Sequence, residues 1–183
     1  MKSLFTCFFI SLFTLTFSAC STSEASSVSS ALQESTAGDT SFPRDDHGEV
    51  LPFYNRRNDS KKVDAAIIEA ARSGKKALIV MGANWCHDSR SLATHLETPR
   101  FKDMIRASYI LEYVDVGQKN KNQDIAKRFG LDGTPGTPTV LIIDGTGTLL
   151  NSKEAPTWRN AASRSENEIF DYFERYAMKA TQP

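Results

Sequence analysis

From residue 60 onward, short continuous apolar runs alternate with stretches whose apolar residues recur at helical spacing. Three runs have the length and composition of buried strands: 77–81, 109–116 and 139–143. Helical spacing predicts helices between and around these strands: 61–73, 90–97, 101–107, 124–129 and a final helix after 165. The pattern indicates an α/β domain, in which strands separated by helices are expected to pair in parallel.

Signals at the ends of these elements support the assignment. Ser60 is a candidate N-cap for the first helix, and Gly74 closes that helix. Ser165 followed by Glu168 is a capping box that opens the final helix. Residues 144–150 read Asp-Gly-Thr-Gly-Thr-Leu-Leu, which predicts a tight turn and a hairpin after the third strand. We therefore expect a mixed central sheet, with parallel strands plus an antiparallel C-terminal hairpin, flanked by helices.

The N-terminal residues follow a different pattern. Lys2 is the only charge before Glu24, and residues 4–17 form an apolar run broken only by Ser, Thr and one Cys. At about 1.5 Å per residue, such a run is too short to cross a roughly 30 Å hydrocarbon core as a helix. A basic start, a short apolar centre and small residues after it are typical of an export signal, which we expect to span residues 1–19.

The end of this run, Phe17-Ser18-Ala19-Cys20, resembles the bacterial lipobox. The resemblance implies cleavage before Cys20 and lipidation of that cysteine, which would give a stable two-chain anchor. By the same resemblance, Ser21 favours the outer membrane of a two-membrane bacterium, with the protein facing the periplasm. Phe17 departs from the usual aliphatic residue, so a plain small-residue cleavage site is the alternative.

A stretch rich in serine and threonine follows the signal. From Ser21 to Ser41, 11 of 21 residues are Ser or Thr, and few are large and apolar. Such a segment buries too little surface to offset its ordering entropy, so we expect a flexible tether. The chain is thus predicted to comprise a signal peptide (1–19), a lipidated cysteine with its tether (20–42) and one globular domain (43–183).

Composition and charge narrow the possible functions. The 183 residues carry 22 Lys and Arg against 22 Asp and Glu, so the formal charge cancels and no electrostatic footprint for nucleic acid is present. Of the three cysteines, Cys7 leaves with the predicted signal and Cys20 is the predicted lipidation site. Cys86 is then the one thiol expected in the mature chain. It cannot form an internal disulfide, and it is either buried and inert or exposed and reactive.

Two motifs carry a family resemblance. Trp85-Cys86-His87-Asp88-Ser89 follows the first strand, and Gly136-Thr137-Pro138-Thr139 precedes the third. With the order of the elements, these motifs resemble the thioredoxin superfamily, and especially exported thioredoxin-like proteins. The latter also have counterparts of three further segments of this chain: Thr98-Pro99, Phe101 and Val114-Asp115-Val116. The resemblance covers roughly residues 60–178 and implies a thioredoxin-like fold.

The resemblance also implies roles for single residues. It places Cys86 at the first turn of a helix, where unpaired backbone N–H groups and the helix dipole stabilise a thiolate. Pro138 matches the family's cis-proline, which sets the Thr137 backbone beside Cys86 to pair with an extended substrate. A trans proline that opens an edge strand is the alternative. Trp85 and His87 are candidate substrate contacts, although His87 reads equally well as an exposed bystander.

Two departures from the family change the expected chemistry. Ser89 stands where Cys-x-x-Cys proteins have their second cysteine, and Val80 replaces the buried carboxylate found six residues before the nucleophile. A mixed disulfide on Cys86 then has no neighbouring thiol to resolve it, so a dithiol reduction cycle is not expected. Ser89 is either a hydrogen-bond donor to the thiolate or a simple helix residue. Arg90 is a candidate source of positive charge, which Asp88 opposes.

Two classes of function remain open. The first is thiol–disulfide exchange through one catalytic cysteine, with client protein thiols or disulfides, or a small thiol, as partners. The second is a non-catalytic thioredoxin-fold module that binds an envelope protein or an extended peptide. A role like that of monothiol glutaredoxins is disfavoured, because His87 and Asp88 replace the Gly and Phe of their Cys-Gly-Phe-Ser loop. Trp158 either covers the groove beside Cys86 or caps an edge of the core.

No cofactor is predicted, and no metal site. A zinc or copper site needs several convergent side-chain ligands, and the motifs around Cys86 offer no such set.

Overall fold

The computed structural model describes residues 41–54 and 59–178 of the chain. The predicted signal peptide (1–19), the predicted lipidation site Cys20 and the tether up to residue 40 lie outside the described residues. None of the helices in the described part combines the length and the apolarity that a membrane span requires.

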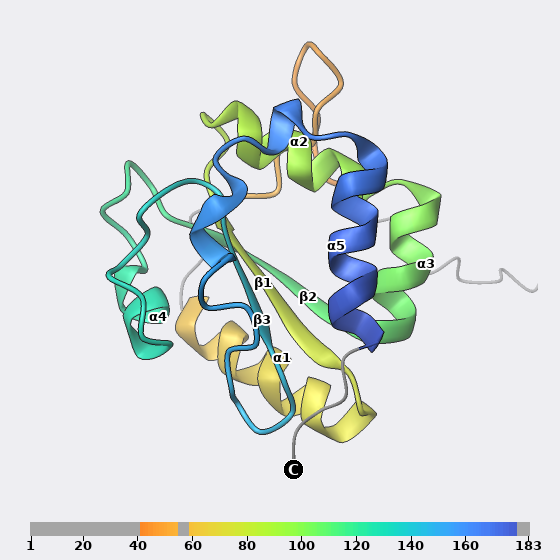
Figure 1. Cartoon of the computed structure of the whole chain (residues 1–183). Coiled ribbons are helices and arrows are strands. Elements are labelled where there is room, and N and C mark those ends of the chain that lie inside the picture. Colours follow the sequence, from red (N-terminus) through yellow and green to blue (C-terminus); the bar gives the residue numbers. More distant parts are fainter. Residues whose placement is uncertain (1–40, 55–58, 179–183) are drawn as a thin grey trace, which may run out of the picture. The chain divides into compact units, whose positions relative to one another are not determined.

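A three-stranded mixed sheet forms the centre of the domain (Figure 1). Its strands are β1 (Lys76–Gly82), β2 (Tyr109–Asp115) and β3 (Thr139–Ile143), in the order β2-β1-β3. β1 pairs in parallel with β2 and antiparallel with β3. The strands match the three predicted apolar runs to within a residue at each end, which confirms the thioredoxin-like α/β class with a mixed sheet.

The expectation that helix-separated strands all run in parallel is wrong for β3. β1 and β2 end together, with Gly82 opposite Asp115, and β3 begins at that same end, with Thr139 opposite Met81. The connection from β2 to β3 therefore begins and ends at the same end of the sheet, and it does not cross over to the opposite end. Its helix, α4 (Gln123–Arg128), has only six residues, too few for a crossover of the usual length. β3 consequently runs back along β1 in the opposite direction.

The helices cover both faces of this sheet. They are α1 (Asp59–Ser73), α2 (His87–Leu96), α3 (Pro99–Ser108), α4 (Gln123–Arg128) and α5 (Glu166–Met178), with two short 3-10 turns, η1 (Ala155–Trp158) and η2 (Ala161–Ser163). Alternate side chains of β1 point to opposite faces. Leu78 and Val80 pack with α2, α3 and α5, whereas Ile79 and Met81 pack with α1 and α4. Figure 1 shows α3 and α5 side by side on their face of the sheet.

Helix boundaries follow the predicted caps with one exception. Ser165 and Glu168 form the reciprocal bonds of a capping box: the Ser165 N–H donates to Glu168 Oε2 (2.8 Å) and the Glu168 N–H to Ser165 Oγ (3.3 Å). Gly74 has a φ of +67° at the end of α1, as its predicted closing role requires. α1 begins at Asp59, however, so Ser60 lies inside the helix and is not its cap.

The predicted hairpin is shorter than expected. The turn at 144–147 forms, but the returning segment pairs with β3 through a single bridge, Ile143 to Leu149. At Asn151 the side chain replaces further strand pairing: its Oδ1 accepts from the Ile142 N–H (2.9 Å), and its Nδ2 donates to the Val140 carbonyl (2.8 Å). Because the Asn151 carboxamide makes these hydrogen bonds with the edge of β3, the backbone after residue 151 does not continue as a strand and turns into η1.

Trp158 belongs to the core and does not cover Cys86. Its side chain is fully buried, lies parallel to the Phe173 ring with centroids 5.3 Å apart, and meets Tyr172 edge-on at 4.7 Å. Of the two alternatives from the sequence, the one in which the tryptophan caps an edge of the core is therefore nearer to what is observed, since Trp158 is a fully buried member of the core. The stacked and edge-on aromatic pairs fix the η1 segment against α5.

Replacing Asn151 with alanine tests the role of this carboxamide. The change strands the buried N–H of Ile142 and the buried carbonyl of Val140, so we expect a loss of unfolding free energy of about 2 kcal/mol or more. Urea denaturation followed by circular dichroism measures the loss. Asn167→Ala, which removes one exposed contact with Arg100, is the matched control and should change stability by less than about 0.5 kcal/mol. Equal effects of the two substitutions would contradict the assignment.

Candidate active site

Cys86 lies at the junction between β1 and α2. It is the N-cap residue of α2, with φ −92° and ψ 116°, and its carbonyl accepts the first helical hydrogen bond from the Arg90 N–H (3.1 Å). Its thiol is reduced and partly exposed. The backbone N–H groups of the first helical turn have no partners within the helix, and a helix N-terminus favours negative charge near it, although the Cys86 side chain makes no capping hydrogen bond.

The Thr137–Pro138 segment lies directly against this cysteine. The peptide bond between the two residues is cis, and the Cys86 thiol donates to the Thr137 carbonyl with Sγ 3.3 Å from the oxygen. Both residues of the segment are buried. The contact follows from the sheet, because the end of β1 and the start of β3 share one edge, where Met81 pairs with Thr139. Residues 51 positions apart in sequence are thereby brought into contact.

Ser89 lies in the first turn of α2 and is fully buried. Its hydroxyl has no hydrogen-bond partner among the described residues, and it does not bond to Cys86 in this state. It packs instead against Gly82 and Phe53: a Cβ added at Gly82 would lie 2.8 Å from Ser89 Oγ and 2.6 Å from the Phe53 ring. Only glycine leaves room at position 82. The role of Ser89 as a donor to the thiolate stays a prediction.

Trp85 lies beside an open cavity next to the cysteine. Its side chain is 48% exposed, and its indole N–H donates to the Gly117 carbonyl (2.8 Å). The cavity has a volume of about 350 Å³ and is lined by Phe53, Asn84, Trp85, Asp115 and residues of the 117–121 loop. An aromatic face with several polar groups around it is suited to a side chain of an extended ligand. Trp85 is thus positioned as the sequence predicted for a substrate contact, a role that stays a prediction.

Charges near the start of α2 form a paired network. The His87 imidazole is largely exposed, with Nε2 3.2 Å from Glu49 Oε1. Arg90 Nε lies 3.0 Å from Asp45 Oδ2 and 2.9 Å from Glu49 Oε2. The expectation that Arg90 supplies positive charge to Cys86 therefore needs correction, because two carboxylates share that charge. Asp88 is also occupied, since its Oδ1 accepts from the Ala162 N–H (2.9 Å).

The pKa of Asp45 reflects this network. Burial acts to raise it, but hydrogen bonds from the backbone N–H groups of Glu49 and His47, together with the Arg90 charge, outweigh burial and hold the pKa below its ordinary value. Asp45 consequently stays ionised and paired with Arg90 at neutral pH.

The segment 43–53, which we call the N-terminal strap, was missed as part of the site. The backbone of Phe53 and the side chain of Asn84 exchange two hydrogen bonds of 3.0 Å each, and the Val50 N–H donates to Thr94 Oγ1 (3.0 Å). Arg90 also donates to the Asn84 carbonyl (2.9 Å). The strap therefore fixes the loop that carries Trp85 and Cys86. Its sequence has no helical or strand period, so only the charges at positions 45 and 49 hinted at a partner.

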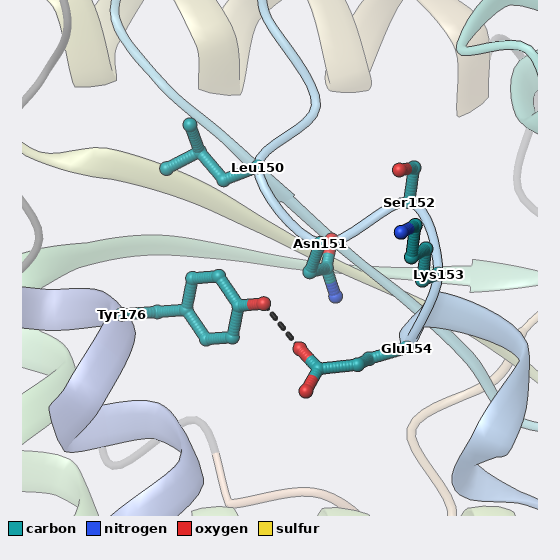
Figure 2. Close-up of a pocket in the computed structure, with 6 residues that line it drawn as sticks. All are labelled: Leu150, Asn151, Ser152, Lys153, Glu154 and Tyr176. Atoms are coloured by element: carbon teal, nitrogen blue, oxygen red, sulfur yellow. Dashed lines mark hydrogen bonds between the residues drawn. The ribbon is translucent and has the colours of Figure 1, made fainter.

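A second cavity, of about 330 Å³, is separate from these residues (Figure 2). It is lined by Leu150, Asn151, Ser152, Lys153, Glu154 and Tyr176, none of which the sequence singled out for chemistry. The Tyr176 hydroxyl donates to the Glu154 carboxylate across it. Burial and this hydrogen bond raise the pKa of Tyr176 well above its ordinary value. Within residues 41–54 and 59–178, no three metal-ligating side chains converge, so no residue is assigned to a metal.

Comparison with known proteins places this geometry in a family context. A family described as thioredoxin-like matches residues 58–145. The crystal structure of a disulphide isomerase from Xylella fastidiosa Temecula1 superposes with a TM-score of 0.65 and 26% identity, over 69% of this chain and 96% of that one. A thioredoxin from Thermus thermophilus (TM-score 0.48, 19% identity, covering 70% and 88%) and the reduced C-terminal domain of Neisseria meningitidis DsbD (0.46, 18%, 64% and 96%) are also similar. A search of curated proteins found no match. The match over 58–145 and the superposition on the isomerase show that this chain has the thioredoxin-like fold.

Proposed function

We propose that this protein carries out thiol–disulfide exchange through Cys86 by a monothiol mechanism. The observation that carries the proposal is the placement of one partly exposed sulfur at the N-cap of α2, 3.3 Å from the Thr137 carbonyl. The helix N-terminus favours the thiolate, which is the reactive form. The Thr137 backbone can pair with an extended substrate and hold its sulfur in line with Cys86.

The exchange step converts a client disulfide into a mixed disulfide with Cys86. The Cys86 thiolate attacks one sulfur of a client disulfide, an Sγ–S bond forms, and the other client sulfur leaves as a thiolate that takes a proton from water. Cys86 is oxidised to a mixed disulfide while the leaving thiol is reduced. Ser89 cannot attack this bond, because its hydroxyl replaces a thiol at the resolving position. A second thiol, from the same client or from a small molecule, must release Cys86.

This cycle suits disulfide isomerisation or the protection of exposed client cysteines. In isomerisation the client's own thiol resolves the mixed disulfide, so no second cysteine of the enzyme is needed. The similarity to a protein named disulphide isomerase, at 26% identity, supports this direction. We further propose that the protein works in the bacterial envelope, anchored through lipidated Cys20 and facing the periplasm, on the strength of the signal-like segment 1–19 and its lipobox-like end.

A disulfide probe tests the chemistry of Cys86. In the full chain with Cys7→Ser and Cys20→Ser, Cys86 is the only cysteine left. We expect 4,4′-dithiodipyridine to release one equivalent of thiopyridone and to leave a stable mixed disulfide, visible by absorbance and intact mass. The reaction should outpace that of free glutathione at pH 6, where few ordinary thiols are ionised. A further Cys86→Ser substitution should abolish release. A rate no faster than that of glutathione would favour a non-catalytic binding module.

Restoring a second thiol tests the monothiol assignment. In the same background, Ser89→Cys places a thiol one helical turn from Cys86. We expect this variant to release a second equivalent and to end as an internal disulfide with no adduct. Ser91→Cys, also in α2, is the control: its thiol is not three residues from Cys86, so each of its cysteines should retain its own adduct. An adduct that persists on Ser89→Cys would show that Ser89 does not occupy the resolving position.

A further inference from the structure

Arg159 lies at the edge of the proposed site and has no partner. It follows η1, its side chain is exposed, and it makes no hydrogen bond or ion pair with any residue of the described part of the chain. Most other arginines there are engaged: Arg90 with Asp45 and Glu49, Arg100 with Glu166, Arg128 with Asp64, and Arg164 over the Trp158 ring. An unpaired guanidinium is available to bind an external group.

The stem of Arg159 packs directly on the loop that faces Cys86. A Cβ built on Gly136 would lie 2.1 Å from Cδ and 2.3 Å from Cγ of Arg159, so a larger residue at position 136 would displace the arginine side chain from this position. Gly136 immediately precedes Thr137, whose carbonyl receives the Cys86 thiol. Successive Cα atoms are about 3.8 Å apart, so the stem of Arg159 packs one residue from the backbone that would pair with substrate.

The segment that carries Arg159 also contacts the other side of the site. Ala162, three residues on, donates its N–H to Asp88 Oδ1 in the first turn of α2. Residues 155–163 therefore bridge the Gly136–Pro138 loop and the start of the helix, and Arg159 lies on this bridge. No ion pair joins Arg159 to a carboxylate of residues 41–54 or 59–178, so its positive charge is unpaired within the described part of the chain.

We propose that Arg159 forms a carboxylate-binding subsite, which selects substrates with an acidic group close to the reacting sulfur. Arginine binds carboxylates through paired N–H donors, and a charge at the edge of a site acts chiefly on association. The carboxylate belongs either to an acidic residue next to a client cysteine or to glutathione. The proposal rests on the thiol–disulfide exchange proposed above and adds a substrate class to it.

Matched disulfide probes test the subsite in the full chain with Cys7→Ser and Cys20→Ser. One pair is a short peptide with Glu or Gln beside its cysteine, activated as the 2-pyridyl disulfide. The other pair is N-acetyl-S-(2-pyridylthio)glutathione, whose acetylated amine carries no charge, and its neutral diester. Attack by Cys86 on the substrate sulfur forms the mixed disulfide and releases 2-thiopyridone, a neutral leaving group whose absorbance gives the rate. The ratio of acidic to neutral rates reports recognition separately from the reactivity of the thiol.

We expect the acidic member of at least one pair to react roughly two- to five-fold faster, the size of one exposed ion pair, with the preference weakening at high salt. The pair that shows the preference identifies the source of the carboxylate. Arg159→Gln should reduce the ratio to one, and Arg159→Lys should retain part of it. Arg72→Gln is the matched control, because Arg72 is also exposed and unpaired in the described chain but lies in the last turn of α1, before the start of β1.

Three results would overturn the subsite: equal rates for both members of both pairs, a preference that survives Arg159→Gln, or an equal loss in Arg72→Gln. In each case fast reaction with the neutral probes would leave thiol–disulfide exchange intact. Failure of Cys86 to react with any probe, neutral or acidic, would instead overturn the proposed function and the subsite together.

Discussion

The contact between the Cys86 thiol and the Thr137 carbonyl depends on the antiparallel placement of β3. Because β3 enters the sheet at the edge where β1 leaves it, the start of α2 and the segment before Pro138 lie together. A parallel third strand would have put that segment at the far end of the sheet, about seven residues of strand away from Cys86. The geometry of the whole site therefore depends on the β2–β3 connection, residues 116–138, in which the only helix is the six-residue α4.

Around this contact lie the features on which the proposed monothiol chemistry depends. The N-cap position, the neighbouring backbone and the open cavity beside Trp85 are present. Ser89 stands where Cys-x-x-Cys proteins have their second cysteine, and its side chain is buried close to Gly82. The N-terminal strap adds a second constraint, since it pairs with Asn84 and engages Arg90 in ion pairs with Asp45 and Glu49. In the proposed mechanism such a site captures a client sulfur, and its release depends on a thiol from outside the site.

Sequence patterns predicted the elements well where the signal is local. The capping box at Ser165 and the three strands came from nearest-neighbour chemistry, and all of them form. The direction of β3 depends on where a connection runs in space, which no local period encodes. The same limit explains why the sequence did not reveal the roles of the strap and of Asn151, because each acts through hydrogen bonds between residues that are distant in the sequence. The role proposed for Arg159 was hidden for the same reason, because it depends on the packing of Arg159 against Gly136. Cys86, Thr137 and Pro138 were found through their motifs, and only the family resemblance, with no local pattern, led us to expect the Thr137 backbone beside Cys86.

The most direct measurement of the central claim is the redox state of Cys86 in living cells that produce the full chain. Rapid acid quenching and alkylation, followed by non-reducing electrophoresis and peptide mass spectrometry, would show which sulfur is joined to the cysteine. We expect a population of mixed disulfides at Cys86 that disappears on reduction and in Cys86→Ser. A cysteine recovered wholly as the free thiol, both in ordinary growth and after a pulse of oxidant, would contradict it.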